Sequence, residues 1–289
     1  MLNLTSPAVV RALLLKYGIR PKRRLGQNFL INPGVLEKII AAANLAAGDT
    51  VVEIGPGVGT LTRRLAETAG KVVAVEVDRA LVGLLKETLS GYANIFLVEG
   101  DALKVGLDAL VAAAGGAFPY KVVANLPYYL STSLLTRLLR GDFKVSLLVI
   151  MVQKEVALRL VARPGTKEYG ALSVLVRYKT EPELVAVVSR GSFFPAPEVD
   201  SAVVRLAVRS SPPVAVPDEE LFFRVVRAAF AKRRKTLVNA LAASALGLSR
   251  EVGALVLARA GVDPQQRGET LTLEEFAAVT RSLAAEQEE

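Results

Sequence analysis

Short, continuously apolar runs alternate with helical patterns through the middle of this chain. The apolar runs are TVVEIG (50–55), KVVAVEV (71–77), NIFLVEG (94–100), YKVVAN (120–125) and VSLLVIMVQ (145–153). Between them, segments such as 61–69, 80–89 and 130–140 repeat apolar residues at helical spacing. Parallel strands covered by helices on both faces have this pattern, because neither face of the sheet meets water. The sequence therefore predicts an α/β protein with a mostly parallel sheet.

The pattern changes after a predicted helix at 153–162. Three apolar runs, at 171–178, 183–190 and 201–208, follow without helical patterns between them. We expect them to be antiparallel strands that close the sheet.

A segment rich in serine and proline at 210–220 cannot form a regular element, so it predicts a domain boundary. We expect residues 1–210 to form one domain that begins with a basic arm. Residues 211–289 carry helical patterns and predict a small all-helical domain.

The chain has no cysteine and no histidine among its 289 residues. Disulfides, thiolate nucleophiles, the usual zinc sites and the commonest general base are thereby excluded, and we expect no metal. The longest apolar runs are far shorter than the roughly 20 residues that cross a bilayer, so no membrane contact is expected. Residues 7–20 carry arginine and no acid, which resembles a transit peptide. No small-residue cleavage site follows them, so the pattern favours a segment that stays in the mature protein.

The formal net charge is +8, and two basic clusters contain no acidic residue. The first consists of Arg11, Lys16, Arg20, Lys22, Arg23 and Arg24, and the second of Arg224, Arg227, Lys232, Arg233, Arg234 and Lys235. Either cluster could be a solvated face, but two clusters that flank one domain favour phosphate contacts. We expect neutralisation of Arg233, Arg234 and Lys235 to flatten the salt dependence of RNA binding.

A glycine-rich turn follows the first predicted strand in VVEIGPGVGTLT. Gly55, Gly57 and Gly59 would let the backbone approach a ligand closely, at the start of a helix. The spacing departs from the dinucleotide fingerprint, which requires its third glycine where Thr60 stands. A nicotinamide oxidoreductase is therefore disfavoured.

The following strands also end in polar residues, namely Glu76, Asp101 and Asn125. Ligands bind beyond the carboxyl ends of parallel strands, so these side chains and Gly55 should line one crevice. Glu76 suits ribose hydroxyls, and Asp101 could accept a hydrogen bond from an adenine amino group.

Several motifs together resemble class I S-adenosylmethionine-dependent methyltransferases of the ribosomal RNA adenine dimethyltransferase family. They are GQNFL (26–30), EIGPGVGTLT (53–62), VEVD (75–78), GDAL (100–103), NLPYY (125–129), FFPAPEVDSAVVRL (193–206) and FAKRRKTLVNAL (230–241). The resemblance implies a Rossmann-like fold with a seven-stranded, mostly parallel sheet and S-adenosylmethionine as cofactor. It also implies that residues 1–210 form the S-adenosylmethionine-binding catalytic domain and that the helical domain at 211–289 contacts RNA or the ribosome. It implies that Asn28 and Leu30 complete a cofactor site with Gly55, Gly57, Glu76, Asp101 and Asn125.

The segment NLPYY can supply what methylation of adenine requires. The exocyclic amine is a poor nucleophile, because its lone pair is delocalised into the ring. The side-chain oxygen of Asn125 and the backbone carbonyl of Leu126 can accept hydrogen bonds from its two N–H groups and hold the lone pair toward a methyl donor. Pro127 fixes the backbone after that carbonyl, and Tyr128 offers a ring for stacking of a flipped-out base. The resemblance implies a second aromatic wall, for which we favour Phe194.

The motifs resemble the small-subunit branch of the family. That branch dimethylates two adjacent adenosines near the 3′ end of 16S ribosomal RNA. The resemblance therefore implies a cytoplasmic monomer that acts on a small-subunit assembly intermediate. Two alternatives stay open: a large-subunit 23S methyltransferase of the macrolide-resistance type, and a non-catalytic ribosome-assembly factor.

Overall fold

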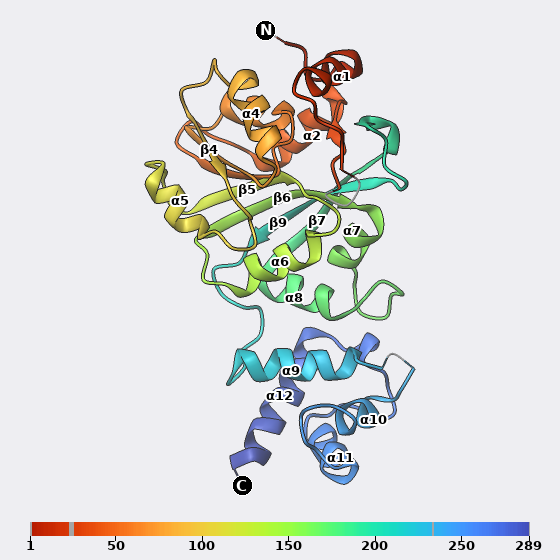
Figure 1. The fold of residues 1–289 in the computed structure, drawn as a ribbon. Helices are drawn as coiled ribbons and strands as arrows, with labels where there is room; N and C mark the ends of the chain where they lie inside the picture. The colour runs from red at the N-terminus through yellow and green to blue at the C-terminus, as the bar shows by residue number, and fades with distance from the viewer. Residues whose placement is uncertain (1, 23–25, 233, 289) are drawn as a thin grey trace. The chain divides into compact units, whose positions relative to one another are not determined.

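The computed structural model describes residues 2–22, 26–232 and 234–288 (Figure 1), which group into two compact units. The first contains the chain up to Ala157 together with Glu181–Val208, and the second contains Leu158–Thr180 together with the chain from Arg209 onward. The predicted domain boundary at residue 210 stays a prediction.

A seven-stranded sheet in the order β4-β3-β2-β5-β6-β9-β7 forms the centre of the first unit. The neighbours from β4 to β6 are parallel, and β6 pairs with β9 antiparallel. The chain passes from β2 to β3 and β4 on one side and then to β5 on the other, so β2 and β5 flank a topological switch point. The strands are β2 Thr50–Ile54, β3 Lys71–Glu76, β4 Ile95–Glu99, β5 Tyr120–Asn125, β6 Val145–Gln153, β7 Thr180–Val188 and β9 Ser201–Val208. The predicted mostly parallel, seven-stranded sheet is confirmed.

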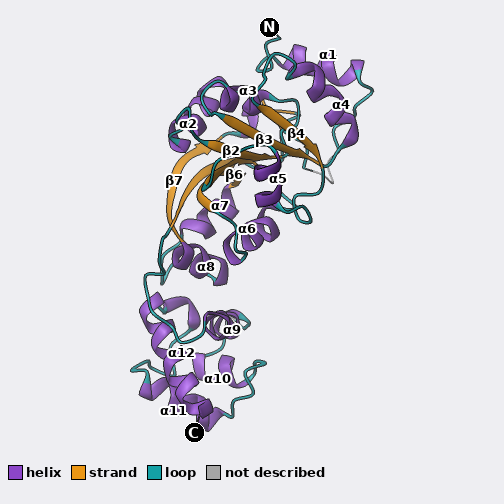
Figure 2. Cartoon of the chain, turned by 90° about the vertical axis from the view of Figure 1, so that its left-hand side faces the viewer, coloured by secondary structure: helices purple, strands orange, loops and turns teal. Residues whose placement is uncertain are grey.

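Helices cover both faces of this sheet (Figure 2). Val51, Val72 and Val123 belong to one core cluster with residues of α2 and α3, and the alternate residues Val52 and Val122 are also buried. Burial on both faces explains why the strands are continuously apolar. The helices from α1 to α7 are α1 Pro7–Lys16, α2 Pro33–Ala43, α3 Thr60–Ala66, α4 Arg79–Thr88, α5 Leu107–Ala113, α6 Ser131–Arg140 and α7 Lys154–Val161.

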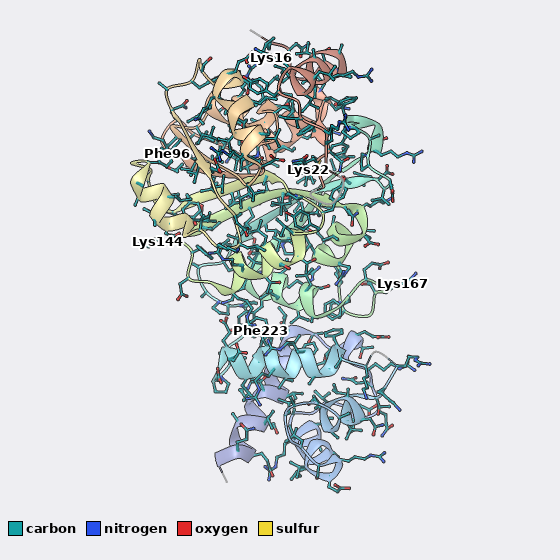
Figure 3. The ribbon with its side chains drawn as sticks, viewed as in Figure 1. Lys16, Lys22, Phe96, Lys144, Lys167 and Phe223 are labelled. Carbon is teal, nitrogen blue, oxygen red and sulfur yellow. The ribbon has the colours of Figure 1, made fainter. Side chains whose placement is uncertain are left out.

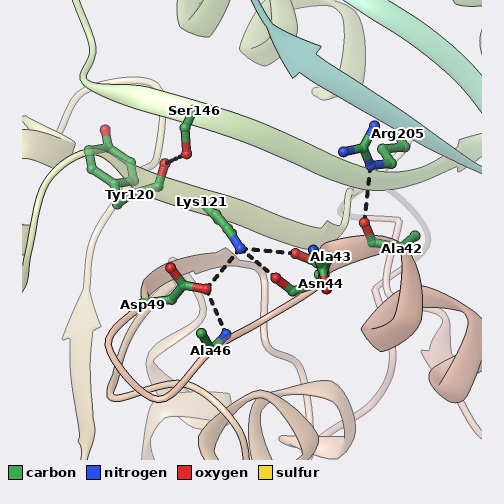
Figure 4. A network of polar contacts seen from close by, with 9 residues as sticks. All are labelled: Ala42, Ala43, Asn44, Ala46, Asp49, Tyr120, Lys121, Ser146 and Arg205. Carbon is green, nitrogen blue, oxygen red and sulfur yellow. Dashed lines mark hydrogen bonds and ion pairs between the residues drawn. The ribbon is translucent and has the colours of Figure 1, made fainter.

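Two local devices hold α2 in place. Asn32 is the N-cap of α2, since its side chain accepts a hydrogen bond from the Val35 amide, and Pro33 occupies the first helical position. At the other end, Lys121 Nζ donates to the carbonyl oxygens of Ala43 and Asn44 at 3.2 and 2.7 Å and pairs with Asp49 at 2.8 Å (Figure 4). Because Lys121 belongs to β5, this cluster ties the C-terminus of α2 to the strand that ends in Asn125.

The prediction of a strand at 171–178 is wrong, since this segment lies in α8 (Ala171–Lys179). Leu172, Val174, Leu175, Val176 and Tyr178 are all buried, so the helix has no polar stripe that would reveal its period. A short buried helix and a buried strand give the same apolar run.

The remaining helices of the second unit are α9 Glu219–Phe230, α10 Leu237–Ala242, α11 Arg250–Arg259 and α12 Leu273–Glu288. Their core is aromatic: Tyr178 stacks on Phe222 with ring centroids 4.8 Å apart, and Phe223, labelled in Figure 3, meets Tyr178 edge to face. In the described residues beyond Val208 every regular element is a helix. None of the described helices is long and apolar enough to span a bilayer.

Candidate active site

The glycine turn after β2 forms the floor of a cavity of about 350 Å³. Gly57 has a φ of 62°, and a Cβ atom there would lie 2.9 Å from the ring of Phe29. Only glycine therefore fits where β1 (Phe29–Leu30) crosses the turn.

Glu76, at the end of β3, points its carboxylate at this turn. Its Oε2 accepts from the Gly57 amide at 3.3 Å, and its Oε1 accepts from the Asp78 amide at 2.9 Å. Burial raises the pKa of Glu76 above its usual value, although the two backbone donors oppose that effect. The carboxylate is thus fixed in a largely dry position where it can accept from ligand hydroxyls.

Asp78 anchors the N-terminal arm beside Glu76. It caps α4 through the Ala80 amide, and its Oδ2 accepts from Lys22 Nζ at 2.8 Å and from Gln27 Nε2 at 2.9 Å. Burial alone would raise the pKa of Asp78, but the hydrogen bonds from Lys22, Gln27 and Ala80 outweigh it and lower that pKa. The contacts of Asp78 with Lys22 (labelled in Figure 3) and Gln27 place the segment 26–30 along the cavity.

The loop after β4 supplies the opposite wall. Asp101 Oδ1 accepts from the Leu103 amide at 2.9 Å, and Ala102 and Leu103 also line the cavity. The guanidinium of Arg137 on α6 donates to the carbonyl oxygens of Ala102 and Val105 at 2.6 and 2.8 Å. An acidic group beside apolar side chains can hold a base with an exocyclic amine.

Asn125 stands at the end of β5 with its amide orientation fixed. Its Nδ2 donates to the Asn28 carbonyl at 3.1 Å, which directs Oδ1 away from that contact and leaves it as an acceptor. Gly26 lies against the same segment, since a Cβ there would be 3.0 Å from the Tyr128 amide nitrogen and its φ is 61°. The segments GQNFL and NLPYY therefore pack directly on each other.

A second cavity, of about 380 Å³, shares Gly26, Gln27, Asn28 and Tyr129 with the first. Pro21, Tyr128, Gln153 and residues 195–199 complete its lining. The Tyr128 hydroxyl and Ser201 Oγ, on β9, lie 2.7 Å apart and form a hydrogen bond. The ring of Tyr128 is therefore held in one orientation at the edge of this cavity.

The structure brings every predicted cofactor residue to the first cavity. They are Asn28, Leu30, Gly55, Gly57, Glu76, Asp101 and Asn125. Of the predicted catalytic residues, Asn125 and Pro127 line the first cavity and Tyr128 lines the second. Leu126 and Phe194 line neither.

The side chain of Leu126 is buried, and its carbonyl oxygen accepts no hydrogen bond from the described part of the chain. Phe194, on β8 (Phe193–Phe194), pairs with Phe29 across a two-stranded antiparallel sheet. The Arg11 guanidinium lies over its ring, 5.4 Å from the centroid. The roles of Leu126 and Phe194 stay predictions.

The two basic clusters differ in their surroundings. Lys16 pairs with Glu87 at 2.7 Å and Lys22 with Asp78, so distant acids neutralise part of the first cluster. In the second cluster Arg227 pairs with Glu220 at 2.9 Å, while Arg234 and Lys235 are exposed. Arg23, Arg24 and Arg233 lie outside the described residues. Among the described residues, no group of three acids could hold a metal ion.

Sequence reasoning missed Gln27, Asp78, Arg137 and Gln153. A signal existed for Asp78, because an aspartate between a strand and a helix is a typical N-cap. Gln27 lies in the GQNFL motif, but its contact with Asp78, like that of Arg137 with the loop after β4, joins residues far apart in the chain. No local pattern marks Gln153 as a residue that lines a cavity.

Comparison with known proteins fits this geometry. The family model described as ribosomal RNA adenine dimethylase matches residues 18–284. A curated relative from Pelotomaculum thermopropionicum, named ribosomal RNA small subunit methyltransferase A, is 56% identical and covers 98% of each chain. Its namesake from Moorella thermoacetica is 52% identical and covers 97% of this chain and 99% of its own.

Two solved structures are similar at the level of the whole chain. A dimethyladenosine transferase from Plasmodium falciparum has a TM-score of 0.74 and 29% identity, and covers 87% of this chain and 95% of its own. The 23S rRNA methyltransferase ErmE has a TM-score of 0.68 and 28% identity, and covers 89% of this chain and 100% of its own. With a family model that matches nearly its whole length, the chain belongs to the ribosomal RNA adenine dimethylase family.

Proposed function

We propose that this protein is an enzyme that dimethylates the N6 amines of two adjacent adenosines near the 3′ end of 16S ribosomal RNA, with S-adenosylmethionine as methyl donor. The observation that carries the proposal is the placement of Asn125. Its amide oxygen is left as an acceptor where the first cavity meets the segment that both cavities share.

The donor set of the first cavity fits S-adenosylmethionine. The fixed Glu76 carboxylate suits ribose hydroxyls, Asp101 suits the adenine amine, and the side chains of Val77 and Leu103 suit the faces of the base. When bound, the cofactor supplies an electrophilic methyl group, so no metal or covalent protein intermediate is required.

The second cavity would hold the flipped-out adenosine. Asn125 Oδ1 and the Leu126 carbonyl would accept hydrogen bonds from the two N–H groups of the amine and direct its lone pair toward the first cavity. Pro127 limits the backbone freedom of Leu126, so the two acceptors are oriented before the base arrives. Tyr128 would stack on the base, with its ring held by Ser201.

The proposed substrate is 16S RNA within a small-subunit assembly intermediate, bound by a cytoplasmic monomer. The names of the relatives with 52–56% identity favour the small subunit over the 23S alternative.

The test is transfer of label from S-adenosylmethionine to separated, undermodified ribosomal subunits, followed by mapping of the modified base. We expect label in small-subunit RNA, at two adjacent adenosines. Label in large-subunit RNA would favour the macrolide-resistance type, and no transfer would favour an assembly factor without catalysis. Asn125→Ala should abolish transfer and leave RNA affinity largely intact, and near-normal turnover would refute its assigned role.

A further inference from the structure

We infer that Gln153 contacts the acceptor base and donates a hydrogen bond to one of the ring nitrogens, N1 or N7, that flank the exocyclic amine of adenine. The inference rests on the proposed function, because it concerns the base that the proposed reaction methylates. Gln153 is the last residue of β6, and its side chain lines the second cavity.

The strand register places Gln153 between the proposed catalytic groups. In the parallel pair of β5 and β6, Asn125 lies beside Met151, so Gln153 is two residues further toward the carboxyl edge of the sheet. In the antiparallel pair of β6 and β9, Gln153 lies opposite Ser201, which holds the Tyr128 hydroxyl. Opposite residues in such a pair have Cα atoms about 4.5 to 5.5 Å apart. The backbone of Gln153 therefore lies next to Ser201, the residue that holds the ring of Tyr128.

The amide of Gln153 is unused, whereas the other amides of this cavity are engaged. Gln27 donates to Asp78 and accepts from the Lys22 amide, and Asn28 Nδ2 donates to the Gly26 carbonyl. Gln153 is half-buried and makes no side-chain hydrogen bond to residues 2–22, 26–232 or 234–288. A carboxamide that lines a cavity and has no hydrogen-bond partner among the described residues is available to a polar ligand.

The chemistry of adenine decides which atoms the Gln153 amide would contact. The Asn125 side chain and the Leu126 carbonyl would accept hydrogen bonds from both N–H groups of the exocyclic amine. The polar atoms next to the amine are then N1 and N7, and both are acceptors. The NH₂ group of Gln153 is a donor, so it complements either nitrogen, and it adds a contact that the two oxygen acceptors cannot make.

The experiment combines residue and base substitutions. Undermodified small-subunit particles would carry adenosine, 1-deazaadenosine or 7-deazaadenosine at a target position. Methyl transfer would be compared among the wild type, Gln153→Ala and Gln153→Glu. Glu155→Ala is the control, because Glu155 is exposed two residues further along and lines neither cavity.

With adenosine, kcat/KM should fall roughly 10- to 100-fold in Gln153→Ala, the range for loss of one buried hydrogen bond, and should be unchanged in Glu155→Ala. Gln153→Glu should lose at least as much, since a carboxylate has no donor. One of the two deaza bases should lower kcat/KM of the wild type by a similar factor. The same base should cause no further loss of kcat/KM in Gln153→Ala. Cofactor affinity should stay unchanged, because Gln153 does not line the first cavity.

Wild-type kcat/KM in Gln153→Ala would overturn the inference. So would a result in which each deaza base slows Gln153→Ala as much as it slows the wild type. A wild-type enzyme that methylates neither subunit would refute the proposed function instead, and is distinguishable because it appears with unsubstituted adenosine.

Discussion

At the scale of single residues, Glu53 is a buried acid directly before the glycine turn. Its side chain is 1% exposed, and Oε2 has no hydrogen-bond partner in the described part of the protein. Burial, to which the charge of Glu76 adds, raises the pKa of Glu53 from 4.5 to about 8. In neutral solution Glu53 therefore keeps its proton. Glu76 is the acid of the pair that lines the first cavity.

This raised pKa predicts how stability depends on pH. Between about pH 5 and pH 8 the folded state holds a proton that the unfolded state has released, so stability falls as pH rises through this window, by at most about 1.4 kcal/mol per pH unit. Glu53→Gln should remove that loss, so its melting temperature should rise relative to the wild type as pH increases. Thermal unfolding at a series of pH values measures this, with the exposed Glu99→Gln as control. Parallel curves for the wild type and Glu53→Gln would contradict the prediction.

The hydrogen bond between Tyr128 and Ser201 predicts a coupled pair of substitutions. Ser201→Ala and Tyr128→Phe each remove the same 2.7 Å contact, so each should weaken base capture several-fold, by the roughly 1 kcal/mol of one hydrogen bond. The double variant should be no worse than either single variant. The measurement is KM for the RNA and kcat in a double-mutant cycle, and additive losses would show that Ser201 acts by another route.

At the scale of elements, α6 connects the two ends of the site. It begins directly after NLPYY, and its Arg137 holds the loop after Asp101 by two hydrogen bonds. The helix therefore fixes the spacing between the proposed reaction centre and the wall of the first cavity.

Loss of that connection should affect cofactor binding first. Arg137→Ala should weaken affinity for S-adenosylmethionine by about tenfold, because both hydrogen bonds to the loop are lost. Calorimetric titration with S-adenosylmethionine measures the effect. Arg140→Ala is the matched control, since it removes the same charge from an exposed position on the same helix. Equal affinities of the two variants would show that Arg137 does not position the loop.

At the scale of the whole molecule, charge should govern RNA binding. Arg234 and Lys235 are exposed, while Lys16 is paired with Glu87. Each phosphate contact contributes roughly 0.7 to 0.9 to the slope of log K against log salt concentration. Arg234→Gln with Lys235→Gln should therefore lower that slope by more than one, and Lys16→Gln should change it little. Filter binding of undermodified small-subunit RNA at several salt concentrations measures it, and an unchanged slope would mark the second cluster as a solvated face.

Much of the site was predictable because its residues follow strands whose pattern is local. Glu76, Asp101 and Asn125 each end an apolar run, and parallel strands bring their carboxyl ends to one edge. The GQNFL segment is different, since its place depends on β1 pairing with β8 far along the chain. Its role could be stated only by resemblance.

By itself, the sequence determined the parallel sheet, the crevice and the chemistry available in it. Strand period and glycine turns are properties of short stretches, and the absence of histidine and cysteine follows from composition alone. Only the tertiary structure decided that 171–178 is helical, that the Asn125 amide is oriented by Asn28, and that Gln153 faces the second cavity. Each of these depends on partners that lie far away in the chain. Tertiary packing selects such partners, and a continuously apolar run does not specify them.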